Sequence, residues 1–193
     1  MKLRLVTASV VAGAALVVAS LAAAAVINGT DGNDTIVGTQ AADLINGLGG
    51  NDQIASGGGS DIVLAGAGDD VVRAGAGPDT VWGNAGDDTL HGGDGADIIH
   101  GRSGNDVIYG GGDADQLYAG FGADEVYGGY GNDHLYAVAS DGQLDRLDCG
   151  PEWDVATIRA GEPTLVVNCE RVHVVQDDAT TNEPGESNTT EGP

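Results

Sequence analysis

Residues 92–100 read Gly-Gly-Asp-Gly-Ala-Asp-Ile-Ile-His, and this nine-residue stretch sets the pattern of most of the chain. Its sixth residue, Asp97, belongs to a series of twelve aspartates that stand nine residues apart without a slip. The series is Asp34, Asp43, Asp52, Asp61, Asp70, Asp79, Asp88, Asp97, Asp106, Asp115, Asp124 and Asp133. An aliphatic residue follows each aspartate two positions later, as Ile99 follows Asp97, and a glycine precedes ten of them by two positions. A phase kept this long indicates an internal repeat.

The two parts of each repeat predict different local structures. The first six residues, as in Gly-Thr-Asp-Gly-Asn-Asp at 29–34, are small or favour tight turns, including left-handed ones. The last three, as in Thr-Ile-Val at 35–37, place a branched aliphatic between two variable residues, which is typical of a minimal strand with one inward side chain. A nine-residue unit cannot bury its own aliphatic, so we predict an all-β fold in which the units stack and their strands pair in parallel.

The repeat resembles the hemolysin-type calcium-binding family, the RTX nonapeptide G-G-x-G-x-D-x-U-x. The best local matches are residues 92–99 and 128–135, and the resemblance covers residues 29–136. It implies a right-handed parallel β-roll with two repeats per coil, and therefore about six coils. It also implies calcium ions between successive turns, held by the aspartate carboxylates and by main-chain carbonyls.

On this resemblance all twelve aspartates of the series are calcium ligands. Asp34, Asp52, Asp70, Asp88, Asp106 and Asp124 would line one edge, and Asp43, Asp61, Asp79, Asp97, Asp115 and Asp133 the other. Six turns per edge leave five gaps, so we expect several Ca²⁺ ions, up to about ten. Oxygen ligands of this kind suit a hard divalent cation. The alternative is that the aspartates only hold the turns by accepting hydrogen bonds from main-chain N–H groups.

Two of the turns depart from the pattern. Residues 38–43, Gly-Thr-Gln-Ala-Ala-Asp, lack the second and the fourth glycine, and Asp113 replaces a glycine in the turn that ends at Asp115. We expect weaker or vacant sites beside Asp43 and Asp115.

The two ends of the chain differ from the repeats. Residues 1–25 combine an early Lys and Arg, an uncharged run and a stretch of alanines, which is typical of a cleaved signal peptide; an uncleaved anchor is the alternative. We therefore expect a secreted, extracellular protein without stable membrane insertion after cleavage. Residues 176–193 are acidic and lack apolar periodicity, which predicts a disordered tail.

We assign residues 26–136 to the roll and residues 137–175 to a C-terminal cap. An open solenoid end exposes aliphatic side chains and strand edges, so a cap is needed. After a three-residue insertion the phase resumes at Asp145 and Asp154. Cys149 and Cys169 are the only cysteines, and in an exported chain we expect them to form a disulfide that closes the cap; a free thiol is the alternative.

The composition excludes several functions. The 193 residues include 34 glycines and 30 acids but only 7 Lys and Arg, a formal net charge of −23, which does not suit nucleic-acid binding. Zinc-protease and serine-hydrolase motifs are absent from the sequence, and its four histidines form no nucleophile–base pattern. We therefore predict a calcium-binding protein without catalysis, in which Ca²⁺ stabilises or induces the roll.

Aromatic residues suggest a second function. The residue three after each aspartate should face outward, and Tyr109, Tyr118, Tyr127 and Tyr136 occupy this position in the later repeats. Such ladders would serve a cell-surface adhesion or carbohydrate-binding module whose partner is a glycan or a protein. We favour the other interpretation, in which the rings stack between strands and stabilise the sheets.

Overall fold

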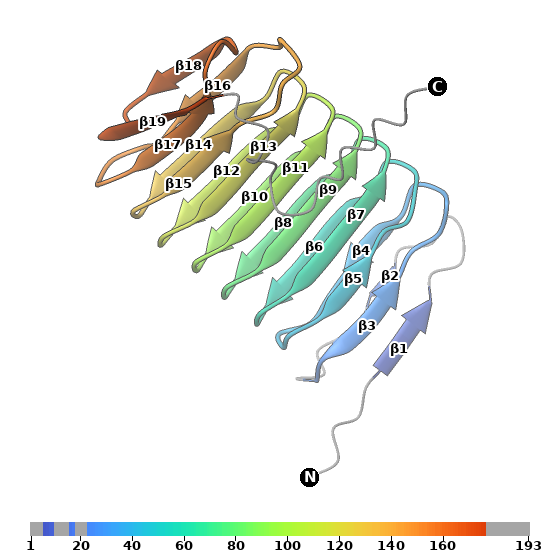
Figure 1. The fold of residues 1–193 in the computed structure, drawn as a ribbon. Helices are drawn as coiled ribbons and strands as arrows, with labels where there is room; N and C mark the ends of the chain where they lie inside the picture. The colour runs from blue at the N-terminus through green and yellow to red at the C-terminus, as the bar shows by residue number, and fades with distance from the viewer. Residues whose placement is uncertain (1–5, 10–15, 18–22, 177–193) are drawn as a thin grey trace, which may run out of the picture.

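The chain winds into a solenoid whose coils each give one short strand to each of two facing sheets (Figure 1). The computed structural model describes residues 6–9, 16–17 and 23–176. All strand pairs in this part of the chain are parallel, and from β3 to β15 the register pairs residues two repeats apart, as in Leu90 with Ile108. No helix in the described residues is long and apolar enough to cross a membrane.

Consecutive strands alternate between the two sheets, so spatial neighbours differ by two in their numbers. One sheet contains β1 (Val6–Ser9), β3 (Ala25–Asn28), β5 (Leu44–Asn46), β7 (Ile62–Ala67), β9 (Thr80–Ala85), β11 (Ile98–Ser103), β13 (Gln116–Phe121), β15 (His134–Ala137), β17 (Val155–Arg159) and β19 (Arg171–Val175). The other contains β2 (Leu16–Val17), β4 (Thr35–Val37), β6 (Gln53–Gly58), β8 (Val71–Ala76), β10 (Thr89–Asp94), β12 (Val107–Gly112), β14 (Glu125–Tyr130), β16 (Asp145–Asp148) and β18 (Thr164–Val167). The twelve repeats supply β4 to β15, which confirms the predicted all-β parallel roll.

The core consists of the aliphatic side chains that the two sheets turn toward each other. The predicted inward residue of each repeat is buried, and Ile99, Ile108 and Leu117 are fully so. From β6 to β14 each strand has six residues instead of the predicted three, because it continues into the first half of the next repeat. The alternation of inward and outward side chains continues there, since the first repeat position is small enough to face the core, as Ala65 and Ala119 do.

Parallel strand pairing continues on both sides of residues 26–136, and the division into roll and cap stays a prediction. The segment assigned to a cap forms β16 to β19, which pair in parallel with β14 and β15 and with one another. Of the predicted signal peptide, β1 and β2 pair with β3 and β4, while most of residues 1–22 lie outside the described residues. Removal of this segment stays a prediction. The predicted tail lies outside the described residues from 177 onward.

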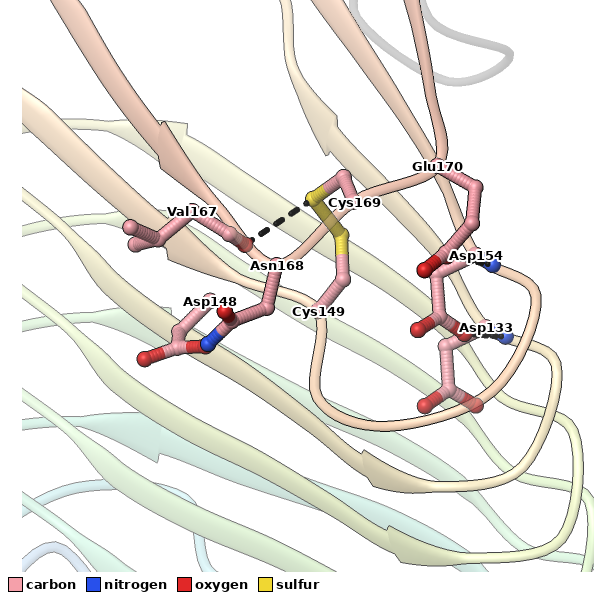
Figure 2. Close-up of a disulfide and its surroundings, with 8 residues drawn as sticks. All are labelled: Asp133, Asp148, Cys149, Asp154, Val167, Asn168, Cys169 and Glu170. Carbon is pink, nitrogen blue, oxygen red and sulfur yellow. Dashed lines mark hydrogen bonds between the residues drawn. A yellow bond between two sulfur atoms is a disulfide. The ribbon is translucent and has the colours of Figure 1, made fainter.

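A disulfide joins Cys149, after β16, to Cys169, before β19 (Figure 2). The two Cα atoms are 5.2 Å apart, and the described chain contains no free cysteine. Cys149 is fully buried in the hydrophobic core between the sheets. The predicted disulfide is therefore confirmed, and it ties the last strand to the preceding coil.

Replacing both cysteines with alanine should lower the free energy of unfolding by about 3 kcal/mol, because the closed loop restrains about 20 residues of the unfolded chain. Denaturant unfolding at a fixed calcium concentration measures the loss. A double variant that matches the unaltered protein would contradict this role for the disulfide.

Aromatic rings stack along the outer face of each sheet. On one sheet Trp82, His100, Tyr118 and Tyr136 form a continuous stack with ring centroids 5.8, 4.4 and 4.5 Å apart. On the other, Tyr109 stacks between His91 and Tyr127, and the Arg146 guanidinium lies 5.1 Å from the Tyr127 ring centroid. The stacking follows from the parallel register, which places residues 18 apart side by side, and it confirms that the ladders connect neighbouring strands.

Tyr118→Ala should lower the free energy of unfolding by about 1–2 kcal/mol, because the variant loses a ring contact on each side. Tyr130→Ala is the control, since Tyr130 is 72% exposed on the same roll. Thermal or denaturant unfolding compares the two variants. Equal losses would show that the stack itself contributes nothing.

Candidate metal sites along the two edges of the roll

The turns bring the repeat aspartates together as two columns, one on each edge of the roll. The main-chain N–H of each aspartate donates to Oδ1 of the aspartate one coil further on, as from Asp79 to Asp97 and from Asp97 to Asp115, both at 2.8 Å. One column contains Asp34, Asp52, Asp70, Asp88, Asp106 and Asp124, and the other contains Asp43, Asp61, Asp79, Asp97, Asp115 and Asp133. The structure thus groups the twelve predicted residues into the two sets that the family resemblance implies.

Both columns extend further than we predicted. Asp124 donates to Asp145 at 3.0 Å, and Asp133 donates to Asp154 at 2.7 Å. Asp154 in turn donates to Oε2 of Glu170 at 2.8 Å, so Asp133, Asp154 and Glu170 lie one above another (Figure 2). The nine-residue phase that resumes after residue 136 could have predicted that Asp145 and Asp154 belong to the columns. Glu170 lies outside the repeat and is placed here by the neighbouring disulfide.

The second carboxylate oxygen of most column members has no partner. Oδ2 is buried without a hydrogen bond in Asp52, Asp61, Asp70, Asp79, Asp88, Asp97, Asp106, Asp115, Asp124, Asp133 and Asp154. Each of these side chains is at most 2% exposed. A buried, unpaired carboxylate oxygen carries a large desolvation cost, which is not offset within the protein. Holding the turn therefore uses one oxygen of each aspartate and leaves the other available.

Main-chain carbonyls approach the same region. A Cβ atom at Gly92 would contact both Oδ2 of Asp97 and the carbonyl oxygen of Gly110 in the next coil. At the fourth repeat position, Gly59 and Gly77 have φ angles of 115° and 112°, a left-handed conformation that glycine adopts readily. In the described part of the chain no hydrogen bond ends at these two carbonyls. The turns from Asp52 onward thus combine one free carboxylate oxygen with unpaired fourth-position carbonyl oxygens.

The side chains alone do not form a metal cluster. Among the described residues, no three His, Cys, Asp or Glu side chains converge on one point. The chemistry that each turn offers is a single carboxylate with surrounding carbonyls, which is the donor type that Ca²⁺ accepts. The residues present therefore fit a calcium ion in each turn that keeps its free Oδ2.

Burial raises the pKa of the column aspartates. Desolvation is the main cause, and the charges of neighbouring column members add to it: the pKa of Asp88 and of Asp115 rises to about 8, and that of Asp97 and of Asp124 to about 7. The hydrogen bond from the preceding aspartate acts in the opposite direction but is smaller. At neutral pH these carboxylates need a proton or a cation to be stable in the roll.

The two turns expected to be weak differ from each other. Both oxygens of Asp43 accept hydrogen bonds within the protein, which supports a weak or vacant site there. Asp115 keeps a free Oδ2 like its neighbours. Asp113 takes a φ of 71° and so adopts the conformation of the glycine it replaces, which aspartate tolerates better than most residues. The geometry thus gives Asp115 an ordinary turn; the two expectations about affinity stay predictions.

Comparison with known families agrees with this geometry. The model of the RTX calcium-binding nonapeptide repeat matches in four segments, residues 28–63, 64–99, 91–126 and 112–142. Together they span residues 28–142, more than half of the chain, and the protein belongs to this family. No curated protein matches the chain.

Without metal, the stability of the roll should fall as the pH rises from about 4 to about 8. The folded-state pKa values of the column aspartates lie above the unfolded value of about 4, so the folded chain binds more protons in this window. The stability that these aspartates contribute is fully present below about pH 4, and it is lost as the pH rises through their folded-state pKa values.

Denaturant unfolding of protein passed over a chelating resin tests this dependence, with a higher midpoint expected at pH 5 than at pH 8. Saturating calcium should remove or reverse the difference, because the ion competes with the protons. A metal-free midpoint that rises with pH would show that the columns are not buried as described.

Proposed function

We propose that this is an exported, non-catalytic protein in which Ca²⁺, bound between successive turns, stabilises or induces the β-roll. Membership of the RTX family supports calcium binding. The observation that carries the proposal is the free Oδ2 on successive aspartates of both buried columns. A repeated, desolvated anionic oxygen beside main-chain carbonyls is suited to a divalent cation.

Electrostatics explain why the ions would matter for folding. Within residues 29–136 the only basic residues apart from histidine are Arg73 and Arg102. Carboxylates one coil apart raise each other's pKa, so an unneutralised column opposes the stacking of coils. Divalent cations would remove this repulsion, and their binding free energy would then become part of the folding free energy.

The predicted metal-ligand role of the twelve aspartates, with up to about ten ions, has most support from Asp52 onward, where Oδ2 stays free. Asp145 and Asp154 extend the two columns and are added as candidates. Burial raises the pKa of both, as it does within the repeats. Their turns lie after the segments that match the family, so the sites would continue into the predicted cap.

Export is supported by the sequence of residues 1–25 and by the disulfide. Disulfides persist in oxidising, extracytoplasmic compartments. Low-affinity calcium sites would also fill outside the cell, because extracellular calcium is millimolar and extracellular modules bind it with dissociation constants of about 10⁻⁴ to 10⁻³ M. We propose that the roll folds fully after export.

The alternative function, adhesion or carbohydrate binding through the aromatic ladders, has less support. The rings are nearly parallel and stacked on one another, with interplanar angles of 4° to 9°, so neighbouring rings cover each other's faces. A sugar that stacks on an aromatic ring needs a free face, which the ladders offer only at their ends. A glycan array on calcium-loaded protein separates this function from a purely structural role of the rings.

Asp97→Asn should reduce the number of bound calcium ions and lower the Tm in calcium, because the amide keeps the Oδ1 contact to Asp79 but removes the anionic oxygen. Isothermal titration gives the ion count. Asp94→Asn is the matched control, since it removes the same charge from an exposed side chain of the same repeat.

The unaltered protein should bind several ions and gain β-structure in circular dichroism on calcium addition. Full β-structure without metal, or an unchanged ion count in Asp97→Asn, would argue against the proposal.

A further inference from the structure

Threonines occupy the second position of the first two turns, where glycine is the commonest residue in later repeats. We propose that Thr30 and Thr39 close these turns with their own hydroxyl and N–H groups in place of a metal ion. The first coil then folds without calcium, and the ion sites begin at Asp52. This inference rests on the proposed function only in taking the later turns as calcium sites.

The first turn closes on itself around Thr30. The Thr30 N–H donates to Oδ2 of Asp34 at 2.6 Å, and its hydroxyl lies 2.9 Å from the same oxygen. The hydroxyl also lies 3.3 Å from the carbonyl oxygen of Gly32 and accepts the Gly32 N–H at 3.2 Å. The threonine thus contacts the carboxylate and the fourth-position carbonyl that remain unpaired in later turns.

The second turn repeats this arrangement. The Thr39 N–H donates to Oδ2 of Asp43 at 2.6 Å, and the hydroxyl lies 3.0 Å from Oδ1 of Asp43 and 3.2 Å from the Ala41 carbonyl. The Ala41 N–H donates to the hydroxyl at 3.1 Å, and the Ala25 N–H donates to Oδ1 of Asp43 at 2.7 Å. Thr39 is 4% exposed, so the hydroxyl is enclosed in the turn.

Asp34 keeps one free oxygen, but that oxygen has a different role. It is Oδ1, which in the later turns accepts an N–H from the preceding coil. Oδ2, which lies beside Gly29 as its equivalents lie beside the other first-position glycines, is the oxygen paired with Thr30. The oxygen that would serve an ion in the turn is therefore used in both Asp34 and Asp43.

Backbone conformation explains why other substitutions at the second position do not have this effect. Leu48, Asn84 and Arg102 also replace glycine there, but their φ angles are 80°, 77° and 82°, as in the glycine turns. Thr30 and Thr39 are not in this left-handed region. The strands that lead into the threonine turns, β3 and β4, end at Asn28 and Val37, whereas β6 to β14 continue through the second repeat position. β5, which leads into the Leu48 turn, also ends early, at Asn46.

The main-chain N–H of the fourth repeat position also has a different partner in the first two turns. In later turns this N–H donates to the next coil, as Gly50 donates to the Ala67 carbonyl at 2.8 Å. In the first two turns it donates to the threonine of its own turn instead. These two turns therefore depend less on a following coil, and charge-assisted donors stabilise their carboxylates without a cation. A preformed first coil would present paired edges on which the next coil can stack.

Hydrogen exchange of the full chain, measured by mass spectrometry in metal-free buffer, tests the proposal. Peptides that cover residues 29–46 should exchange at least about tenfold more slowly than peptides that cover residues 92–109. Calcium should protect mainly the second set. Equal, rapid exchange of both sets without metal would overturn the proposal.

Matched variants isolate the hydroxyl groups. Thr30→Val/Thr39→Val should remove the metal-free protection of residues 29–46 without lowering the calcium count, whereas Thr30→Ser/Thr39→Ser should retain that protection. A valine variant that stays protected would overturn the proposal.

Calcium counting separates this proposal from the proposed function. Asp34→Asn/Asp43→Asn should leave the number of ions unchanged, while Asp97→Asn lowers it. If the first variant also lowers the count, the first coil holds calcium and the inference is wrong. If neither lowers it, the proposed function fails, while the hydrogen-exchange comparison still judges the role of the threonines.

Discussion

The main constraint on the roll is that every turn buries a carboxylate at the same position, one coil from the next carboxylate. From Asp43 onward, each column aspartate accepts an N–H from the preceding coil with one oxygen and, in most turns, keeps the other oxygen unpaired at the protein interior. Each repeat adds only one large aliphatic side chain to the hydrophobic core, so the core offers little free energy to offset this cost. A proton or a cation at each free oxygen removes the conflict, and of the two only a cation can also ligate the neighbouring carbonyls.

The same constraint explains the composition of the turns. A side chain at Gly92 or Gly110 would enter the space beside the free carboxylate oxygen, and Gly77 has a left-handed φ angle that glycine adopts readily. Glycine is required by these close approaches, and aspartate provides a short carboxylate that reaches the adjacent N–H. The excess of both residue types therefore reflects the geometry of the edges more than the solubility of the surface.

Much of this architecture could be predicted from the sequence, because a nine-residue phase determines which residues meet in successive coils. Parallel stacking follows from that phase, and the resemblance to the RTX repeat adds two repeats per coil, which gives the two aspartate columns and places Tyr118 beside Tyr136. The six-residue strands were missed because small first-position residues look like turn formers in isolation. Glu170 was missed because its place depends on the disulfide, and the roles of Thr30 and Thr39 depend on side-chain contacts that a repeat consensus does not contain.

The turns at the two ends of the repeat series lie beside coils that do not follow the repeat, unlike the turns in its middle. At the C-terminal end, side-chain carboxylates replace missing carbonyls: Asp141 accepts the Gly122 N–H and Glu152 accepts the Gly131 N–H, both at 2.6 Å. The disulfide then holds the last strand. At the other end, threonine hydroxyls complete the first turns. If calcium stabilises the middle of the roll as proposed, ends that are closed by other means would remain as templates on which the coils stack again after the ions are lost.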